Sequence, residues 1–487
     1  MSIELWQTWS NIGNLFFLLN IILAVIIIFY ERKNSSSLWA WLMVLFFLPV
    51  VGFFLYFFFG RTFKKDKLKH QSAYYHPELE NISEHQLHEV TTGSFHHYSS
   101  VTRELEGLIL MNLKSETAPL TQNNRLSIYT DGRDKFDALF EDIRQAKDHI
   151  HLEYYIVRKD TLAKQLLTLL AEKARQGVKT LLLYDAVGSN SVNKEFLTDF
   201  LEAGGKAEPF MPSKLPIVNS HMNYRNHRKI AVIDGTIGYT GGFNIGDEYL
   251  GKKAKFGYWR DTHLRITGGA VHSLQHRFLL DWNEASHQHP IKYASAYFPT
   301  PDNHAGAAIQ LVSSGPDSEL SQIKNGFLKL ILRAQESIYI QTPYFIPDIT
   351  IMDALRVAAL SGIDVQIMIP DKSDHPFVHT ATLSVIGDLL DTGAKVYTYH
   401  NGFLHAKTLI IDRKVVTTGS ANMDLRSFHL NFEGNVFIYD REVASAMADI
   451  FFRDVELSGE LTIEDYKNRS LSEKARQRFA RLMAPLL

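Results

Sequence analysis

The chain has 487 residues, of which 45% are hydrophobic and 12% aromatic, enough for two or three domains with packed cores. Its 51 basic and 53 acidic residues give a net charge of −2, which argues against a dedicated nucleic-acid-binding protein, because such proteins carry a clear basic excess. The absence of cysteine excludes disulfides, thiol catalysis and cysteine-ligated metals.

The first 60 residues contain two long apolar runs. Residues 12–30 are apolar apart from Asn14 and Asn20, and residues 38–59 carry no charge. Each run has about the ~20 residues that a helix needs to cross a bilayer, so we expect a transmembrane hairpin over residues 1–60. A signal peptide fits poorly, because no basic residue precedes the first run and no small-residue cleavage site follows it. A re-entrant hairpin that does not cross is the open alternative.

Basic residues predict the orientation of this hairpin. Five of them lie between residues 61 and 69, whereas the loop between the two runs has only Arg32 and Lys33. The side richer in Lys and Arg usually faces the cytoplasm. We therefore expect a multi-pass protein of the cell membrane, with two segments and with the domains that follow them on the cytoplasmic side.

Residues 61–118 are polar and mixed in charge, and we expect a membrane-proximal connector there. Their histidines match no tight metal-ligand spacing, so we predict no metal site and no cofactor. The histidines of this stretch are His70, His76, His85, His88, His96 and His97.

From about residue 119 onward the chain repeats itself, which indicates a duplication. The segment that starts at Ala146 resembles the one that starts at Ala334, and both read as a helix end running into a strand. Gly177 and Gly362 each read as a helix C-cap followed by a buried strand. Because strands alternate with helices, each half is predicted to be α/β. The predicted domains cover residues 119–295 and 300–487.

Both halves carry the motif His-x-Lys-x4-Asp. The matched residues are His227, Lys229 and Asp234 in the first half and His405, Lys407 and Asp412 in the second. All three pairs are offset by 178 residues, and so are Asn244 and Asn422, which end the stretches Gly-Gly-x-Asn and Gly-Ser-x-Asn. A single His-x-Lys would carry no weight, but a duplicated motif in register does.

The spacing predicts how these side chains point. Residues i and i+2 of a strand share a face, so each histidine lies on the same face as its lysine. Asp234-Gly235 is a hairpin turn signal, after which a second strand returns toward Asn244. Two such units related by a pseudo-twofold axis would place two His, two Lys and two Asn around one pocket.

That set of groups suits a phosphodiester. One histidine can attack phosphorus, and the other can protonate the leaving alkoxide and then deprotonate the incoming alcohol. Lysine and asparagine can hold the phosphate oxygens, so that no metal is needed. Farther along, Asp261 and Glu433 match each other and are expected to hydrogen-bond to the far ring nitrogens of the histidines.

Some of these assignments have structural alternatives. Asp234 and Asp412 are catalytic candidates, but a turn or an ion pair at the strand end explains them equally well. Asn244, Asn422 and Ser420 are candidate phosphate ligands, with turn formation as the alternative for the asparagines.

The segment 472–483 is predicted to be an amphipathic helix. Its apolar face comprises Ala475, Phe479, Leu482, Met483 and Leu486, and its basic face comprises Lys474, Arg476, Arg478 and Arg481. Such a helix can lie on anionic lipid or pack on the domain as an ordinary surface helix. Both interpretations stay open at this stage.

The duplicated motif resembles that of the phospholipase D superfamily over residues 119–487. Four stretches are also similar to bacterial cardiolipin synthases, as is the two-segment N-terminus. These stretches are 184–189 (Tyr-Asp-Ala-Val-Gly-Ser), 314–317 (Ser-Gly-Pro-Asp), 341–347 (Gln-Thr-Pro-Tyr-Phe-Ile-Pro) and 485–487 (Pro-Leu-Leu).

The resemblance implies an activity, namely the conversion of two phosphatidylglycerols into cardiolipin and glycerol through a phosphohistidine. It also implies that His227 is the nucleophile and His405 the acid, although the pseudo-symmetry leaves the reverse assignment open. A phospholipase D hydrolase would use the same residues with water as acceptor. A membrane-tethered nuclease is disfavoured by the neutral charge, and a non-catalytic scaffold by the completeness of both half-sites. The oligomeric state is not predicted.

Overall fold

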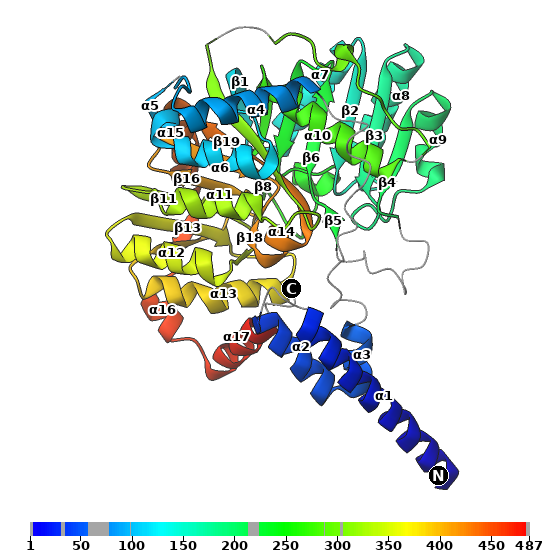
Figure 1. Ribbon diagram of the computed structural model, residues 1–487, viewed down its shortest axis with the longest axis vertical. Coiled ribbons are helices and arrows are strands. Elements are labelled where there is room, and N and C mark those ends of the chain that lie inside the picture. The colour runs from blue at the N-terminus through cyan, green and yellow to red at the C-terminus, as the bar shows by residue number, and fades with distance from the viewer. Residues whose placement is uncertain are drawn as a thin grey trace.

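The computed structural model describes residues 3–30, 35–56, 77–97, 99–212, 224–286, 288–301 and 305–483. Figure 1 shows a body of two sheet-and-helix halves, with the N-terminal helices at one end of the molecule. The helices are α1 (Ile3–Tyr30), α2 (Ser35–Phe47), α3 (Pro49–Leu55), α4 (Pro77–Thr92), α5 (Ser100–Glu104), α6 (Glu106–Glu116), α7 (Gly132–Gln145), α8 (Thr161–Arg175), α9 (Lys194–Glu202), α10 (Ala270–Ala285), α11 (Gln322–Ile331), α12 (Ile349–Leu360), α13 (Pro376–Leu390), α14 (Leu425–His429), α15 (Arg441–Val455), α16 (Ile463–Lys467) and α17 (Leu471–Met483).

The strands of the first half are β1 (Thr121–Tyr129), β2 (His149–Tyr154), β3 (Lys179–Asp185), β4 (Lys206–Phe210), β5 (Arg225–Asn226), β6 (Lys229–Ile233), β7 (Ile237–Gly241), β8 (Trp259–Arg260) and β9 (His263–Thr267). Those of the second half are β10 (Ala307–Ser314), β11 (Ser337–Gln341), β12 (Phe345–Ile346), β13 (Asp364–Pro370), β14 (Lys395–Tyr399), β15 (Phe403–Leu404), β16 (Thr408–Ile411), β17 (Val415–Gly419), β18 (Met423–Asp424), β19 (Asn431–Tyr439) and β20 (Ser458–Glu460).

One mixed sheet runs through both halves. Its strand order is β20-β14-β13-β11-β16-β17-β19-β10-β1-β9-β7-β6-β2-β3-β4. The halves join where β1 and β10 pair antiparallel, with Thr121 opposite Ile309. Counted outward from this junction, β1-β9-β7-β6-β2-β3-β4 matches β10-β19-β17-β16-β11-β13-β14. The predicted pair of α/β domains is confirmed, with the addition that they share one sheet.

Helices cover both faces of this sheet. In the first half, α7, α8 and α9 pack on one face with the inward side chains of β2 and β6. The matching helices α10 and α15 lie on the opposite face, in a core to which both halves contribute. A third core packs α11, α12 and α13 against the strands of the second half. Because the sheet is covered on both faces, its central strands are buried and hold the side chains at their ends firmly.

The turns predicted from the repeat form as expected. Asp234 and Gly235 have φ of 51° and 65°, as a tight hairpin between β6 and β7 requires. The second half makes the same turn with Asp412 and Arg413, at φ of 53° and 50°. Gly177 and Gly362, each with φ of 89°, come directly after the C-cap residues of α8 and α12, Gln176 and Ser361. The second hairpin has Arg413 where the first has Gly235, so its turn lacks the glycine signal in the sequence.

The N-terminal segment forms helices α1, α2 and α3. The second predicted run is interrupted at Pro49, which has no N–H to offer to the carbonyl of Leu45. The side-chain amide of Asn20 donates to that carbonyl over 3.2 Å and to the carbonyl of Pro49 over 2.8 Å. No helix within the described residues is long and apolar enough to cross a membrane, so the predicted crossing stays a prediction. Residues 57–59 of the second run lie outside the described residues.

The predicted connector is folded over residues 77–97 and 99–116, the part that the structure describes. Helices α5 and α6 supply Val101, Leu108 and Ile109 to the core of the second half. Of its histidines, His85 pairs with Glu89, and His97 lies 2.8 Å from Glu106. His70 and His76 lie outside the described residues. The folded part of the segment is therefore tied to the second domain.

Candidate active site

Each predicted histidine lies where its own half of the chain meets the other half. The short strand β5, which precedes His227, pairs with β19 of the second half, and β15, which precedes His405, pairs with β8 of the first half. The His227 amide donates to the carbonyl of Phe432 over 2.9 Å, and the His405 amide donates to the carbonyl of Arg260 over 2.7 Å. Each histidine is thus fixed to the strand that leads into the other half's carboxylate.

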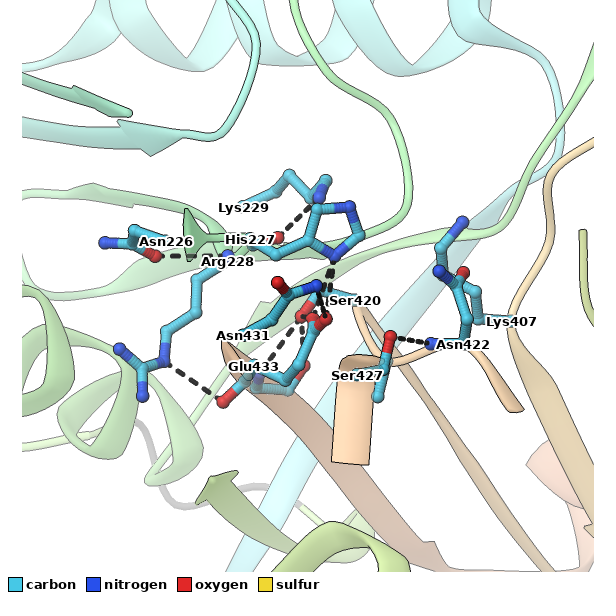
Figure 2. A network of polar contacts seen from close by, with 12 residues as sticks. Asn226, His227, Arg228, Lys229, Lys407, Ser420, Asn422, Ser427, Asn431 and Glu433 are labelled. Atoms are coloured by element: carbon cyan, nitrogen blue, oxygen red, sulfur yellow. Dashed lines mark hydrogen bonds and ion pairs between the residues drawn. The ribbon is translucent and has the colours of Figure 1, made fainter. Parts of the chain in front are cut away.

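The ring of His227 is held by Glu433 from the opposite half. Its Nδ1 lies 3.0 and 2.9 Å from the two carboxylate oxygens, so Nδ1 is the donor and Nε2 keeps its lone pair. Glu433 is fully buried and accepts hydrogen bonds from Ser420 and Asn431 (Figure 2). Burial lowers the pKa of His227 to about 4, although Glu433 opposes the shift. The ring is therefore neutral near pH 7, as a nucleophile must be.

The ring of His405 is held in the same way by Asp261 from the first half. Its Nδ1 lies 2.6 Å from a carboxylate oxygen of Asp261 and 2.9 Å from Nζ of Lys407. Burial lowers the pKa of His405, Lys407 adds to the shift, and Asp261 opposes it. Although burial alone would raise it, Lys407 and His405 hold the pKa of Asp261 below its ordinary value. Each histidine is thus hydrogen-bonded to a carboxylate of the other half.

The two lysines are buried beside their histidines. Lys229 and Lys407 are 1% and 3% exposed, and each ammonium group donates to the carbonyl of the histidine two residues before it. Burial lowers the pKa of Lys229 to about 7, and the charge of Lys407 contributes to the shift. Because the two ammonium groups influence each other, the half-sites form a single electrostatic environment. Figure 2 shows Lys407 and Asn422 across from His227 and Lys229.

The candidate phosphate ligands are not equivalent. Asn244 is engaged on both sides of its carboxamide, accepting from the Ile156 amide over 3.1 Å and donating to the Tyr249 hydroxyl over 3.1 Å. By contrast, the side-chain oxygen of Asn422 is buried and has no hydrogen-bond partner among the described residues. The hydroxyl of Ser420 donates to Glu433. Of the three candidate ligands, Asn422 therefore has the side chain least engaged in hydrogen bonds within the protein.

The two aspartates of the motif lie away from this site. Asp234 is five residues beyond Lys229, about 17 Å along a strand. Its carboxylate accepts from the backbone amides of residues 147, 148 and 149 over 2.8 to 3.0 Å. Asp412 does the same with the amides of residues 335, 336 and 337 over 2.8 to 3.2 Å. The structure therefore places both where they tie the start of β2 and β11 to the hairpin, and not beside the histidines.

Two buried ion pairs, which the sequence analysis did not predict, hold the backbone at Glu433 and Asp261. Arg228 binds both oxygens of Asp281 over 2.9 and 2.8 Å and donates to the carbonyl of Glu433 over 3.1 Å. Arg260 pairs with Asp454 over 2.9 Å and donates to the carbonyl of Asp261. A signal did exist, because Asp281 and Asp454 follow Asp261 and Glu433 by 20 and 21 residues and lie near the ends of α10 and α15. It was hidden because the two arginines do not occupy matching positions.

Aromatic rings, which were also missed, line the histidines. The Tyr155 ring lies 4.8 Å from that of His227, and its centre is 5.4 Å from Nζ of Lys229. The Trp259 ring lies 5.2 Å from that of His405. These rings exclude water from the reacting nitrogens and strengthen electrostatic interactions inside the site.

A duplicated α/β fold with one His-Lys site built across its halves is typical of the phospholipase D superfamily. The family model "Cardiolipin synthase, PLD-like domain" matches residues 139–256 and 327–455, and "Phospholipase_D-nuclease N-terminal" matches residues 18–61. The solved structure of phosphatidylserine synthase from Haemophilus influenzae Rd KW20 shares the fold, with a TM-score of 0.58 and 16% identity over 80% of this chain and 98% of that one.

Close relatives share nearly the full length. The major cardiolipin synthase ClsA of Bacillus subtilis is 50% identical over 474 residues, which cover 97% of this chain and 98% of the relative. Cardiolipin synthase 2 of Staphylococcus epidermidis is 51% identical over 471 residues, covering 97% and 96%. A cardiolipin synthase of Listeria monocytogenes is 48% identical over 449 residues, covering 92% and 93%. The chain belongs to the cardiolipin synthase family of phospholipase D-type phosphatidyltransferases.

Proposed function

We propose that the protein transfers a phosphatidyl group from one phosphatidylglycerol to another, giving cardiolipin and glycerol. The observation that carries the proposal is the crosswise pairing of the histidines. Each ring has its Nδ1 held by a buried carboxylate of the other half, which leaves both Nε2 atoms for the reaction. The substrates and products are the ones that the names of the relatives imply.

In the first step, Nε2 of His227 attacks the phosphorus of the donor lipid. The bond between phosphorus and the headgroup oxygen breaks, and Nε2 of His405 gives its proton to that oxygen, so that glycerol leaves. The phosphatidyl group stays on His227 as a phosphohistidine. The neutral state of His227 near pH 7 supports its role as the nucleophile.

In the second step, the now neutral His405 removes the proton from a headgroup hydroxyl of the acceptor lipid. The resulting oxygen attacks phosphorus, and the bond between phosphorus and nitrogen breaks. Cardiolipin forms, while His227 returns to neutral and His405 is protonated again. Lys229, Lys407 and the amide of Asn422 bind the phosphate oxygens, whose negative charge grows in the transition state.

We further propose that residues 1–60 anchor the protein in the cell membrane, with the two halves on the cytoplasmic side. The match of residues 18–61 to an N-terminal phospholipase D-type segment and the exposed apolar side chains of α1 and α2 support this placement. Phe29 and Phe47, for example, are 74% and 69% exposed. An anchor keeps both lipid substrates within reach of one site.

A product assay tests the proposal. Purified full-length protein in detergent, given only phosphatidylglycerol, is expected to release glycerol and to accumulate cardiolipin in equal amounts. Phosphatidic acid as the sole product would make the protein a hydrolase, which would use the same residues with water as the acceptor.

Two variants test the shared site. His227→Ala and His405→Ala should each abolish turnover and leave the melting curve unchanged. His400→Ala is a matched control, because His400 is exposed, lies five residues before His405 and has its ring nitrogen 3.2 Å from the hydroxyl of Thr398, away from the site. Substantial activity in either active-site variant would contradict a site that needs both rings.

A further inference from the structure

Helix α17 packs on the body with its polar side and turns its apolar side outward. Gln477 and Ala480, which are 7% and 1% exposed, face α13. Leu471, Phe479 and Leu482 lie on the opposite side and are 85%, 61% and 73% exposed. A surface helix of a soluble domain normally buries its apolar side. This helix does the reverse, and so the apolar face predicted from the sequence is unpartnered within the described residues.

The contacts that hold α17 in this orientation are specific. Arg481 pairs with Asp388 of α13 over 2.6 Å, and Ala480 packs in a small cluster with Ala381 of α13 and Ile346 of β12. The orientation is therefore set by an ion pair and by packing of a small residue. The predicted face member Met483 has no described side chain, and Leu486 lies outside the described residues.

Basic side chains flank the exposed apolar stripe. At helical spacing, Arg478 and Lys474 border the stripe on one side and Arg476 on the other. From residue 474 to 483 the helix carries these three basic residues and Arg481, and no acidic residue. An apolar stripe between cationic edges is complementary to a bilayer that contains anionic lipid, in which acyl chains lie below negative headgroups.

The position of α17 connects this face to the active site. Ala480 lies in the same small cluster as Ile346, and Ile346 pairs with Asp424 in the short β12–β18 ladder. Asp424 follows Asn422, the candidate phosphate ligand, by two residues. In Figure 1, α17 and the N-terminal helices lie at the same end of the molecule. A surface bound to α17 would thus lie on the side of the body that carries the apolar N-terminus.

We propose that the Leu471, Phe479 and Leu482 face of α17 docks on an anionic lipid surface and holds the active site against it. The inference rests on the proposed function in that the substrates are anionic lipids. It adds a second membrane contact beside the N-terminal segment, and this contact orients the site, whereas the anchor tethers it.

A single fluorescent label tests the docking directly. The chain has no cysteine, so Phe479→Cys gives one labelling position. Leu201→Cys on α9 is the matched control, since Leu201 is also an exposed apolar residue, at 39%, on a helix of the other half. The labelled full-length protein is reconstituted into phosphatidylcholine vesicles with or without phosphatidylglycerol, and brominated acyl chains serve as quenchers.

We expect the label at position 479 to shift to the blue and to be quenched in vesicles with phosphatidylglycerol, with a weaker effect in phosphatidylcholine alone. The label at position 201 should change in neither. A 479 label that stays as exposed as the 201 label would overturn the proposal. So would a blue shift that depends on protein concentration and resists lipid quenching, because a second copy of the chain would then cover the face.

An activity measurement separates docking from catalysis. The double variant Phe479→Ser with Leu482→Ser should lose about tenfold in turnover on vesicles, since two apolar side chains no longer enter the lipid. In mixed detergent micelles its turnover should stay within about twofold of the parent. Equal turnover of variant and parent on vesicles would contradict the docking role. The label experiment works equally in a His227→Ala chain, so its outcome does not depend on which reaction the protein catalyses.

Discussion

At the scale of single residues, the site depends on two carboxylates that act through the histidine rings. Asp261 and Glu433 hold the Nδ1 atoms of His405 and His227, and both are fully buried. The halves support them differently. Ser420 donates to Glu433, whereas a Cβ at the matching Gly242 would come within 1.9 Å of Asp261. The Asp261 carboxylate thus lies so close to position 242 that only glycine fits there.

Removing either carboxylate charge should cost most of the catalytic rate. Asp261→Asn and Glu433→Gln are each expected to lower kcat by about 10²- to 10⁴-fold, because the amide no longer fixes the ring tautomer or stabilises the imidazolium. Ser420→Ala, which removes only a donor to Glu433, should lose about tenfold. Steady-state kinetics with a melting curve for each variant measures this, and a loss below tenfold in both amide variants would contradict the positioning role.

The pKa shifts predict an acidic activity window. The reactive form needs neutral His227 and protonated His405 and Lys229. With a pKa of about 4 for His227, kcat/KM should fall as the pH drops through that value, since the nucleophile becomes protonated. On the other side it should fall as His405, whose pKa is lowered by burial, loses its proton, and it should fall further near pH 7 as Lys229 loses its own.

The variant Asp261→Asn tests whether the alkaline limb of the kcat/KM profile reports the titration of His405. The charge of Asp261 raises the pKa of His405, so Asp261→Asn should move the alkaline limb of kcat/KM to lower pH. A pH series of initial rates for parent and variant tests both statements. A maximum above pH 8, or a limb that stays in place in the variant, would be incompatible with this assignment.

At the scale of elements, the aspartates of the motif act on the sheet. Asp234 and Asp412 each collect three backbone amides and sit in left-handed turns, at φ of 51° and 53°. This arrangement joins the hairpin to the strand beside it, β2 or β11, and so keeps β6 and β16 straight behind the histidines. Their recurrence at the same spacing reflects the repeated architecture of the turn.

Substitution should therefore change stability and leave the chemistry intact. Asp234→Ala and Asp412→Ala are each expected to lower the free energy of unfolding by roughly 2 kcal/mol, because a charged acceptor for three backbone amides is lost. The turnover of the folded protein should stay within about twofold. Asp234→Asn should lose less stability, because asparagine tolerates the left-handed turn. A normal melting curve combined with a hundredfold loss of turnover would restore these residues to the catalytic set.

At the scale of the whole molecule, neither half is complete. Each histidine takes its carboxylate from the other half, and the sheet is continuous through β1 and β10. Helices α5 and α6, which precede the first domain in sequence, pack into the core of the second. The relative position of the two reacting rings is therefore set by the entire body.

Because two buried lysines supply the positive charge at the phosphate, the assembled site needs no metal for that purpose. Dialysis against a chelator should leave turnover within about twofold of the untreated enzyme. The measurement is the glycerol-release rate before and after treatment, with a metal-dependent phosphatase treated in parallel as the control. Full loss of activity that returns on adding a divalent cation would refute the lysine-based scheme.

The duplication, the α/β class and the residues of the repeated motif can all be read from the amino-acid sequence. Strand periodicity placed His227 with Lys229 and His405 with Lys407, and turn chemistry located the Asp234-Gly235 hairpin, because these are local properties of the backbone. The match between Asp261 and Glu433 is visible in the sequence as part of the repeat. The amphipathic pattern of the C-terminal helix is visible there too.

How those pieces meet depends on the folded molecule. Which histidine each carboxylate holds, the ion pairs of Arg228 and Arg260, and the direction in which Phe479 points depend on contacts between residues far apart in the chain. Periodicity fixes the face of a strand or helix on which a side chain lies, but not what that face meets. That choice is made by the closure of two halves around one site, which is a property of the packed molecule.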